Sequence, residues 1–190
     1  TKQVLINNSG SDSLGISEGD TEAIVGTLSL TGSNSGVIDT HIISTNANGA
    51  WSVTTGDVDG DGDLDVLSAS TYDDKISWYE NDGNQGFTEQ VISTNADGAV
   101  SVTTADVDGD GDLDVLSASF IDDKIAWYEN DGNEVFTEKV ISTNADSAVS
   151  VTTSDVDGDG DLDVLSVSAN DDKIAWYENK GNEVFTEKVI

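Results

Sequence analysis

Residues 44–92 read STNANGAWSVTTGDVDGDGDLDVLSASTYDDKISWYENDGNQGFTEQVI, and this stretch of 49 residues decides the architecture because it occurs three times in succession. Near-copies follow at 93–141 and 142–190, and these two copies differ from each other at only six positions. Self-similarity at a period of this length is typical of repeat architectures, in which one supersecondary unit stacks on its neighbours. We therefore treat 44–92, 93–141 and 142–190 as repeats 1, 2 and 3.

Each repeat is expected to form four β-strands. In repeat 1 these are WSVTTGDV, LDVLSAS, KISWYEN and FTEQVIS, which are rich in β-branched and aromatic residues and are separated by Gly, Asn and Asp. No apolar stripe of helical period is present. Strands such as DVLSAS and KIAWYEN carry apolar groups on both faces, which suits a small sheet that lies between two neighbouring sheets.

Radial stacking of such sheets covers both faces and leaves only short edges exposed. The predicted fold is therefore all-β and built from β-propeller blades, each a four-stranded antiparallel sheet. The three full repeats form an open partial propeller, because a closed ring has roughly four to eight blades. A β-solenoid is the competing geometry, but solenoid rungs are usually shorter, and the nonapeptide GGxGxDxUx does not occur in the sequence.

The N-terminal residues depart from the repeat. VIDTHII at 37–43 aligns with VFTEKVI at 135–141, which indicates the last strand of a preceding, divergent blade. Residues 1–36 contain the strand-like run ISEGDTEAIVGTLSLTG and are expected to form a β-rich segment that ends a preceding domain. The chain begins with Thr1 and lacks the basic and apolar regions of a signal peptide, so we expect it to be an internal piece of a longer protein.

The composition restricts the possible functions. With 38 acidic and 7 basic side chains the formal net charge is -31, which repels nucleic acid and anionic membranes. We expect neither a nucleic-acid partner nor direct membrane insertion. The sequence has no Cys, His41 is its only His, and it contains no nucleophile-elbow or phosphate-loop motif. The chain is therefore not expected to be an enzyme, and no catalytic or organic cofactor-binding residues are assigned.

The acidic residues cluster in one motif, DVDGDGDLD, which occurs without substitution at 57–65, 106–114 and 155–163. Ca²⁺ collects about six to eight oxygen ligands, and a tight loop can provide them from side chains at positions 1, 3 and 5 and from the carbonyl at position 7. Position 9 can complete the shell, and the two glycines permit the positive φ that turns the carboxylates inward. The predicted metal ligands are Asp57, Asp59, Asp61, Asp63, Asp65, Asp106, Asp108, Asp110, Asp112, Asp114, Asp155, Asp157, Asp159, Asp161 and Asp163.

Three Ca²⁺ sites are therefore expected, with Asp63, Asp112 and Asp161 contributing backbone oxygen while their side chains stay in solvent. Carboxylates about 6 Å apart at an effective dielectric of about 20 repel by nearly 3 kcal/mol per pair, which opposes a metal-free loop. A solvated acidic turn is the simplest alternative. An EF-hand would need a Glu at position 12 and flanking helices, and Mg²⁺ prefers fewer protein ligands. Position 12 is instead Ser68, Ser117 or Ser166.

DVDGDGDLDVLSAS followed by KIAWYENDGN resembles the FG-GAP/VCBS repeats of bacterial surface proteins, which are related to the integrin α-subunit propeller. The resemblance covers residues 44–190. It implies four-stranded blades with a calcium hairpin between the first and second strands, and ligand-binding loops on the opposite face. It also implies a secreted or cell-surface protein that serves adhesion or protein/glycan recognition, with further blades of the parent chain as partners. The alternative is an accessory propeller of a large secreted enzyme whose catalytic domain lies outside this chain.

Two other repeated features have more than one interpretation. The Trp of each WYEN motif could form a sugar-stacking platform, but strand aromatics more often pack between sheets. The acidic pair before each DDK lysine could be a glycosidase-like carboxylate pair, but an active site is normally unique whereas a turn recurs. The two residues before each pair vary between repeats, as expected of a binding surface or of an unconstrained loop: Thr71–Tyr72, Phe120–Ile121 and Ala169–Asn170.

Overall fold

The strands of the computed structural model follow the repeats of the sequence. The structure describes residues 40–181 and 184–189, and the predicted segment 1–36 lies outside them. The chain divides into two units, Thr1–Thr40 and His41–Ile190, and the second contains all the described strands. The described residues contain twelve strands. Among these residues there is no helix that could cross a membrane.

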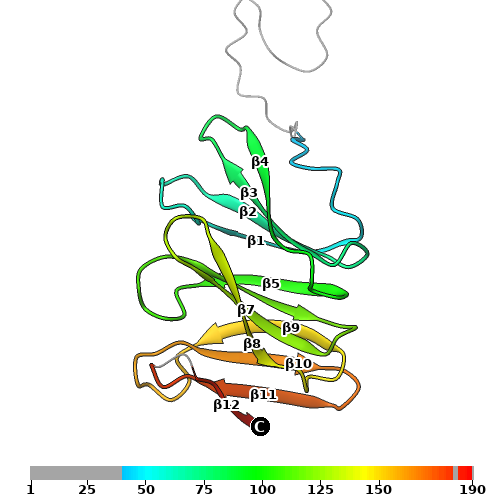
Figure 1. The fold of residues 1–190 in the computed structure, drawn as a ribbon, viewed down its shortest axis with the longest axis vertical. Helices are drawn as coiled ribbons and strands as arrows, with labels where there is room; N and C mark the ends of the chain where they lie inside the picture. Colours follow the sequence, from blue (N-terminus) through cyan, green and yellow to red (C-terminus); the bar gives the residue numbers. More distant parts are fainter. Residues whose placement is uncertain (1–39, 182–183, 190) are drawn as a thin grey trace, which may run out of the picture. The chain divides into compact units, whose positions relative to one another are not determined.

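Each repeat forms one four-stranded antiparallel sheet, called a blade here, whose strands are neighbours in sequence order (Figure 1). Blade 1 consists of β1 (Ala50–Gly56), β2 (Asp65–Ser70), β3 (Lys75–Asn81) and β4 (Phe87–Ser93). Blade 2 consists of β5 (Ala99–Ala105), β6 (Asp114–Ser119), β7 (Lys124–Asn130) and β8 (Phe136–Ser142). Blade 3 consists of β9 (Ala148–Ser154), β10 (Asp163–Ser168), β11 (Lys173–Glu178) and β12 (Thr186–Val189). The three sheets confirm the all-β fold of open, propeller-like blades.

The segment before β1 differs from the blades. Residues 40–43 are the described part of segment 37–43, which the sequence suggests as the last strand of a preceding blade, and they form no strand. Residues 37–39 lie outside the described residues. Blade 1 takes all four of its strands from repeat 1, and only the last residue of β4, Ser93, lies past the predicted end of that repeat.

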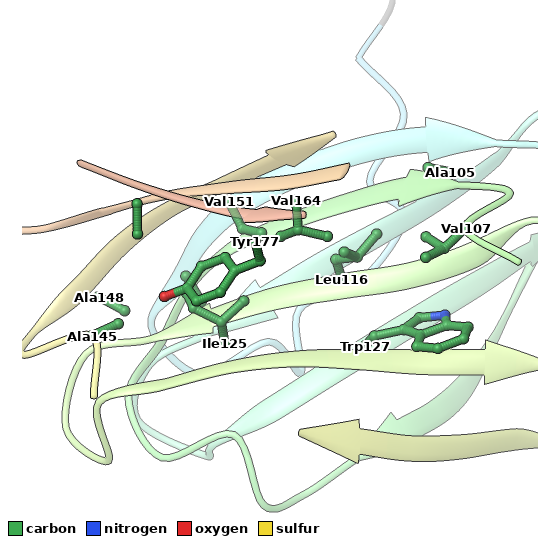
Figure 2. Close-up of a cluster of buried hydrophobic side chains, with 12 residues drawn as sticks. Ala105, Val107, Leu116, Ile125, Trp127, Ala145, Ala148, Val151, Val164 and Tyr177 are labelled. Atoms are coloured by element: carbon green, nitrogen blue, oxygen red, sulfur yellow. The ribbon is translucent and has the colours of Figure 1, made fainter. Parts of the chain in front are cut away.

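The core of the molecule lies between successive blades, because each sheet is apolar on both faces. Figure 2 shows the cluster between blades 2 and 3, which includes Leu116, Ile125 and Trp127 of blade 2 and Val151, Val164 and Tyr177 of blade 3. An equivalent cluster joins blades 1 and 2. Fully burying such side chains contributes about 1.5–3 kcal/mol each, so contacts between repeats contribute strongly to the stability of the fold.

The WYEN tryptophans belong to this core in the first two blades. Trp78 and Trp127 are 1% and 0% exposed. Each meets a phenylalanine of the next blade in a T-shaped contact, Phe136 at 6.3 Å and Phe185 at 6.1 Å between ring centroids. The packing interpretation is therefore confirmed for these two residues.

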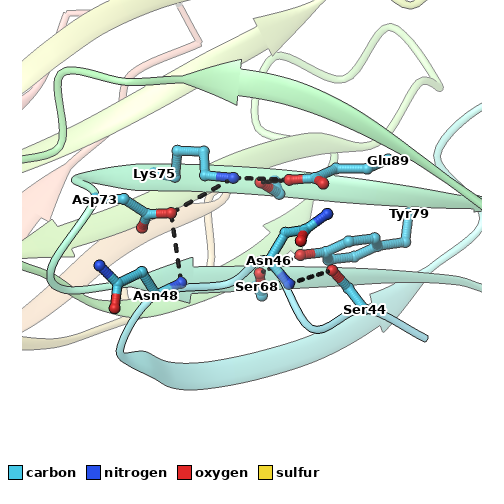
Figure 3. Close-up of polar contacts among 9 residues, drawn as sticks. Ser44, Asn46, Asn48, Ser68, Asp73, Lys75, Tyr79 and Glu89 are labelled. Carbon is cyan, nitrogen blue, oxygen red and sulfur yellow. Dashed lines mark hydrogen bonds and ion pairs between the residues drawn. The ribbon is translucent and has the colours of Figure 1, made fainter. Parts of the chain in front are cut away.

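The acidic pairs form the turns between second and third strands. In blade 1, Lys75 Nζ lies 3.5 Å from Asp73 Oδ2 and 2.8 Å from Glu89 Oε1 (Figure 3). Asp74 has a left-handed backbone with φ 57°, and its Oδ1 accepts a hydrogen bond from Gly98 N at 3.0 Å. The first Asp of the pair thus forms an ion pair with a lysine. The second Asp adopts the left-handed conformation of the turn and accepts a hydrogen bond from the segment that precedes the next blade.

Candidate metal centres

The DVDGDGDLD loops occupy equivalent positions in the three blades. Residues 57–64, 106–113 and 155–162 connect β1 to β2, β5 to β6 and β9 to β10. The hairpin position implied by the sequence resemblance is therefore the observed one. Because antiparallel hairpins alternate between the two ends of a sheet, the loops lie at the end opposite the turns that contain the acidic pairs.

The carboxylates at positions 1, 3 and 5 coil each loop through hydrogen bonds with backbone N–H groups. In loop 1, Asp57 Oδ2 accepts from Gly62 N at 3.1 Å. Asp59 Oδ1 accepts from Asp61 N at 3.1 Å, and Asp61 Oδ1 accepts from Asp63 N at 2.8 Å. Similar bonds recur in the other loops. The successive side chains therefore turn toward the inside of a tight loop.

The two glycines of each loop have the backbone that the sequence predicts. Gly60 and Gly62 have φ of 75° and 98°, and the equivalent glycines of loops 2 and 3 are similar. A Cβ added at Gly60 or Gly62 would meet no atom within 4 Å. Glycine is therefore required for backbone conformation and not for space.

The structure brings three carboxylates together in every loop, with ligand atoms within 4.8 Å of one another. Positions 1 and 3 belong to every cluster, and position 5 or 9 completes it. The clusters are Asp57, Asp59 and Asp61 in loop 1, Asp106, Asp108 and Asp114 in loop 2, and Asp155, Asp157 and Asp163 in loop 3. The remaining predicted ligands lie in the same loops but outside these three-residue groups: Asp63, Asp65, Asp110, Asp112, Asp159 and Asp161.

The position 9 carboxylate also joins its loop to the third strand. Asp114 is fully buried, its Oδ2 accepts from Val107 N at 3.0 Å, and its Oδ1 accepts from Asn130 N at 2.9 Å. Asp65 and Asp163 make the same two bonds. A carboxylate oxygen has a second lone pair, so these bonds are compatible with metal ligation.

The position 7 side chains, expected in solvent, lie against a glycine of the loop between third and fourth strands. A Cβ at Gly83 would collide with Asp63 Oδ2, although Asp63 itself remains exposed. Gly132 and Gly181 have the same relation to Asp112 and Asp161. The glycine in NDGN and NKGN thus leaves room for the DVDGDGDLD loop of the same blade. The strand patterns in the sequence do not indicate this approach.

An asparagine links each loop to the preceding blade, and sequence reasoning missed it. Asn130 Nδ2 donates to Leu113 O of its own loop at 3.2 Å and to Val58 O of loop 1 at 3.1 Å. Asn179 repeats this between blades 3 and 2, with Val107 O at 3.1 Å. The only available signal was the recurrence of Asn after WYE in every repeat.

The electrostatics of the loops favour a bound cation. Asp57 Oδ1 is buried and has no hydrogen-bond partner. Partial burial raises the pKa of Asp59, and the charges of Asp65, Asp61 and Asp57 raise it further against the hydrogen bond from Asp61 N. Burial raises the pKa of Asp114 to about 6, although hydrogen bonds from Asn130 and Val107 oppose the shift. Crowded all-oxygen donors of this kind fit a hard cation such as Ca²⁺ or Mg²⁺.

Comparison with known proteins supports the repeat assignment. The profile of the FG-GAP-like repeat matches residues 57–117, 106–166 and 155–190, and each match starts at the first Asp of a DVDGDGDLD loop. No match was found among curated protein sequences. Virginiamycin B lyase from Staphylococcus aureus has a similar solved structure, with a TM-score of 0.51 and 14% identity over 78% of this chain.

That likeness shows a shared propeller-like fold alone, because the identity is low. The aligned region covers 43% of the lyase chain, so this chain spans less than half of that protein. The three successive profile matches, in contrast, extend over most of the residues whose sheets and loops are described above. The chain therefore belongs to the FG-GAP-like repeat family.

Proposed function

We propose that each DVDGDGDLD loop binds one Ca²⁺ and that the chain is a calcium-stabilised propeller segment of a secreted or cell-surface protein. The observation that carries the proposal is the set of three carboxylate clusters at equivalent positions in the three blades. The buried, unpaired Oδ1 of Asp57 supports it further. FG-GAP-like repeats are typically extracellular, where calcium is abundant.

Calcium fits the loops better than magnesium. Mg²⁺ demands octahedral geometry and usually keeps several waters, whereas Ca²⁺ accepts about six to eight oxygens in flexible arrangements. Each loop offers carboxylates at positions 1, 3, 5 and 9 and the backbone carbonyl of position 7. An affinity of roughly 10⁻⁴ to 10⁻³ M is expected, as for extracellular modules.

The proposed role of the metal is structural. Position 9 joins the loop to the third strand, and the next blade's asparagine joins the loop to its neighbour. A cation that neutralises the carboxylates therefore acts on the contact between blades as well as on one hairpin. Ligands that bind only the native state raise its stability by mass action.

We further propose that the opposite end of the blades recognises a protein or glycan, so that the chain binds rather than catalyses. Tyr72 is 76% exposed, and Phe120 and Ile121 are 42% and 60% exposed. Their backbones are nevertheless held, since Tyr72 N donates to Asn48 O and Ile121 N donates to Asp97 O, both at 3.1 Å. Variable, exposed side chains on a fixed backbone are suited to specific recognition.

Calorimetric titration of metal-free protein with CaCl₂ tests the metal proposal. We expect three Ca²⁺ per chain. Asp108→Asn removes one ligand from the loop 2 cluster and should reduce the count to two. Asp97→Asn is the matched control, because it removes the same charge from an exposed residue at the other end of blade 2. No calcium uptake, or equal losses in both variants, would refute the assignment.

A glycan array probed with calcium-loaded protein tests the recognition proposal. A triple variant with Tyr72→Ser, Phe120→Ser and Ile121→Ser should lose the signal while its three calcium sites remain. Val135→Ser is the control, because Val135 is 56% exposed in the loop between β7 and β8. This loop lies at the end of the blade that holds the DVDGDGDLD loop, away from the proposed recognition surface. A signal unchanged in the triple variant would place recognition elsewhere, and no glycan signal would exclude the glycan part of the proposal.

A further inference from the structure

A continuous chain of hydrogen bonds joins the three DVDGDGDLD loops. In each loop the aspartate at position 9 accepts from the backbone N–H of the residue at position 2. The carbonyl of position 2 accepts from the asparagine that follows WYE in the next blade, and this asparagine donates in turn to the position 9 aspartate of its own loop. The chain runs through Asp65, Val58, Asn130, Asp114, Val107, Asn179 and Asp163.

The part of this chain between loops 2 and 3 joins two candidate metal ligands. Val107 N donates to Asp114 Oδ2 at 3.0 Å, and Val107 O accepts from Asn179 Nδ2 at 3.1 Å. Asn179 N donates to Asp163 Oδ1 at 2.8 Å. Both aspartates belong to the three-carboxylate clusters of their loops. The two clusters are therefore connected across the interface between blades 2 and 3.

The same steps connect loops 1 and 2. Val58 N donates to Asp65 Oδ2 at 3.0 Å, and Val58 O accepts from Asn130 Nδ2 at 3.1 Å. Asn130 N donates to Asp114 Oδ1 at 2.9 Å. Asp65 has the position in loop 1 that Asp114 has in loop 2. The connection is thus a property of the repeat and occurs at both interfaces between described blades.

The connecting residues are shielded from water. Asn130 and Asn179 are 1% and 2% exposed, and Val58 and Val107 are both 3% exposed. The Val107 side chain also belongs to the apolar cluster between blades 2 and 3 (Figure 2). Hydrogen bonds in such surroundings are stronger than in water, and bonds in a chain polarise one another. A displacement of position 2 in one loop therefore disturbs the asparagine of the next blade.

We infer that Asn130 and Asn179 are positioning residues that couple calcium binding at neighbouring loops, so that a filled site tightens its neighbour. The inference rests on the proposed binding of Ca²⁺ by these loops. A cation held in part by position 9 fixes that carboxylate, and with it the position 2 residue and the asparagine of the next blade. The neighbouring loop then has less conformational freedom to lose on binding, which gives positive cooperativity.

The charge of the chain acts in the opposite direction. Each bound Ca²⁺ makes the net charge of -31 less negative and weakens the attraction for the next cation. Salt at about 0.15 M limits this effect to a range of about 8 Å. It does not depend on the asparagines, whereas the hydrogen-bonded connection requires them. Positive coupling that is confined to neighbouring loops therefore distinguishes the two effects.

Equilibrium dialysis against graded CaCl₂ in about 0.15 M salt measures the bound calcium in variants with two working loops. Asp157→Asn disables loop 3 and leaves the neighbouring loops 1 and 2. Asp59→Asn leaves the neighbouring loops 2 and 3, and Asp108→Asn leaves the separated loops 1 and 3. We expect coupling of about fivefold in both neighbouring pairs, which for two equal sites gives a Hill coefficient of about 1.4. The separated pair should have a Hill coefficient of about 1 or less.

Alanine changes at the two asparagines test whether these residues transmit the coupling. Asn130→Ala should remove it from loops 1 and 2 and leave it in loops 2 and 3, and Asn179→Ala should do the reverse. Each variant is the matched control of the other, because both lose the same side chain. Circular dichroism in saturating calcium checks the fold. The comparison of neighbouring and separated pairs needs no asparagine change, so it tests the coupling even where an alanine variant does not fold.

The outcomes separate the coupling from the calcium sites themselves. Two bound Ca²⁺ per two-loop variant with a Hill coefficient of 1 or less in the neighbouring pairs would overturn the inference and leave the proposed sites intact. Equal cooperativity in neighbouring and separated pairs would overturn it as well, as would the loss of coupling from both neighbouring pairs on a single alanine change. An absence of calcium uptake by the parent chain would refute the sites and the coupling together.

Discussion

Replacing Asn130 with alanine should destabilise the chain more than the same change at the equivalent residue of repeat 1, Asn81. The Asn130 side chain is 1% exposed and makes three hydrogen bonds. Its Nδ2 donates to Val58 O and Leu113 O, and its Oδ1 accepts from Gly132 N at 3.2 Å. The backbone N–H that holds Asp114 is retained in the variant.

Asn81 provides the matched comparison. Its side chain donates to Leu64 O at 3.0 Å and accepts from Gly83 N at 3.1 Å, and within the described residues no blade precedes it. Asn130→Ala therefore removes one bond more than Asn81→Ala and leaves Val58 O, in a residue that is 3% exposed, without that donor. A net hydrogen bond contributes about 0.5–1.5 kcal/mol and a buried unsatisfied group costs about 1–3 kcal/mol. We expect Asn130→Ala to lower the free energy of unfolding by about 2 kcal/mol more than Asn81→Ala.

Urea denaturation in saturating calcium, followed by tryptophan fluorescence, measures this difference. The slope of the transition should be similar in the two variants, so that the midpoints report stability. An equal loss of unfolding free energy in the two variants would show that the hydrogen bond from Asn130 to Val58 O contributes nothing to stability. A larger loss for Asn81→Ala would contradict the reasoning outright.

Three further predictions follow from the same geometry. Gly132→Ala should cost more than Gly109→Ala in thermal melts, since both strain a positive φ but only the first drives a Cβ into Asp112. The raised pKa of Asp114, about 6, means that the metal-free folded state binds an extra proton below that pH. Stability measured in chelator should therefore rise from about pH 7 to about pH 5 while calcium affinity measured by titration falls, and Asp114→Asn should reduce both effects. Trp127→Ala should cost about 3–5 kcal/mol in urea denaturation, because the side chain is fully buried between blades.

The strands and the position of the DVDGDGDLD loops could be predicted from the sequence because their signals are local. Runs of β-branched and aromatic residues identified the strands, and regular spacing of aspartates identified the loops. The role of the aspartate at position 9 was harder to predict. Asp114 accepts hydrogen bonds from two backbone N–H groups and also belongs to the carboxylate cluster of loop 2. Its hydrogen bond with Asn130 depends on the register of the second and third strands.

Contacts between repeats could not be predicted, since identical repeats do not indicate which surface of one meets which surface of the next. The bond from Asn130 to Val58 O joins residues 72 positions apart and requires the observed stacking of blades. The approach of Asp112 to Gly132 similarly requires two neighbouring loops at the same end of one sheet. The strand and turn propensities of residues describe single segments and contain no information on contacts between segments.

The melting temperature as a function of calcium concentration tests whether calcium stabilises the folded chain. Each site occupied only in the native state should add about 2.7 kcal/mol at a calcium concentration of 100 times its Kd. The parent chain should melt at increasing temperature as calcium rises. A variant with Asp57→Asn, Asp106→Asn and Asp155→Asn should melt higher than the parent in chelator, because repulsion is relieved, and should respond little to calcium. An unchanged melting temperature on chelation of the parent, or a full calcium response in the triple variant, would show that calcium bound at these loops does not stabilise the fold.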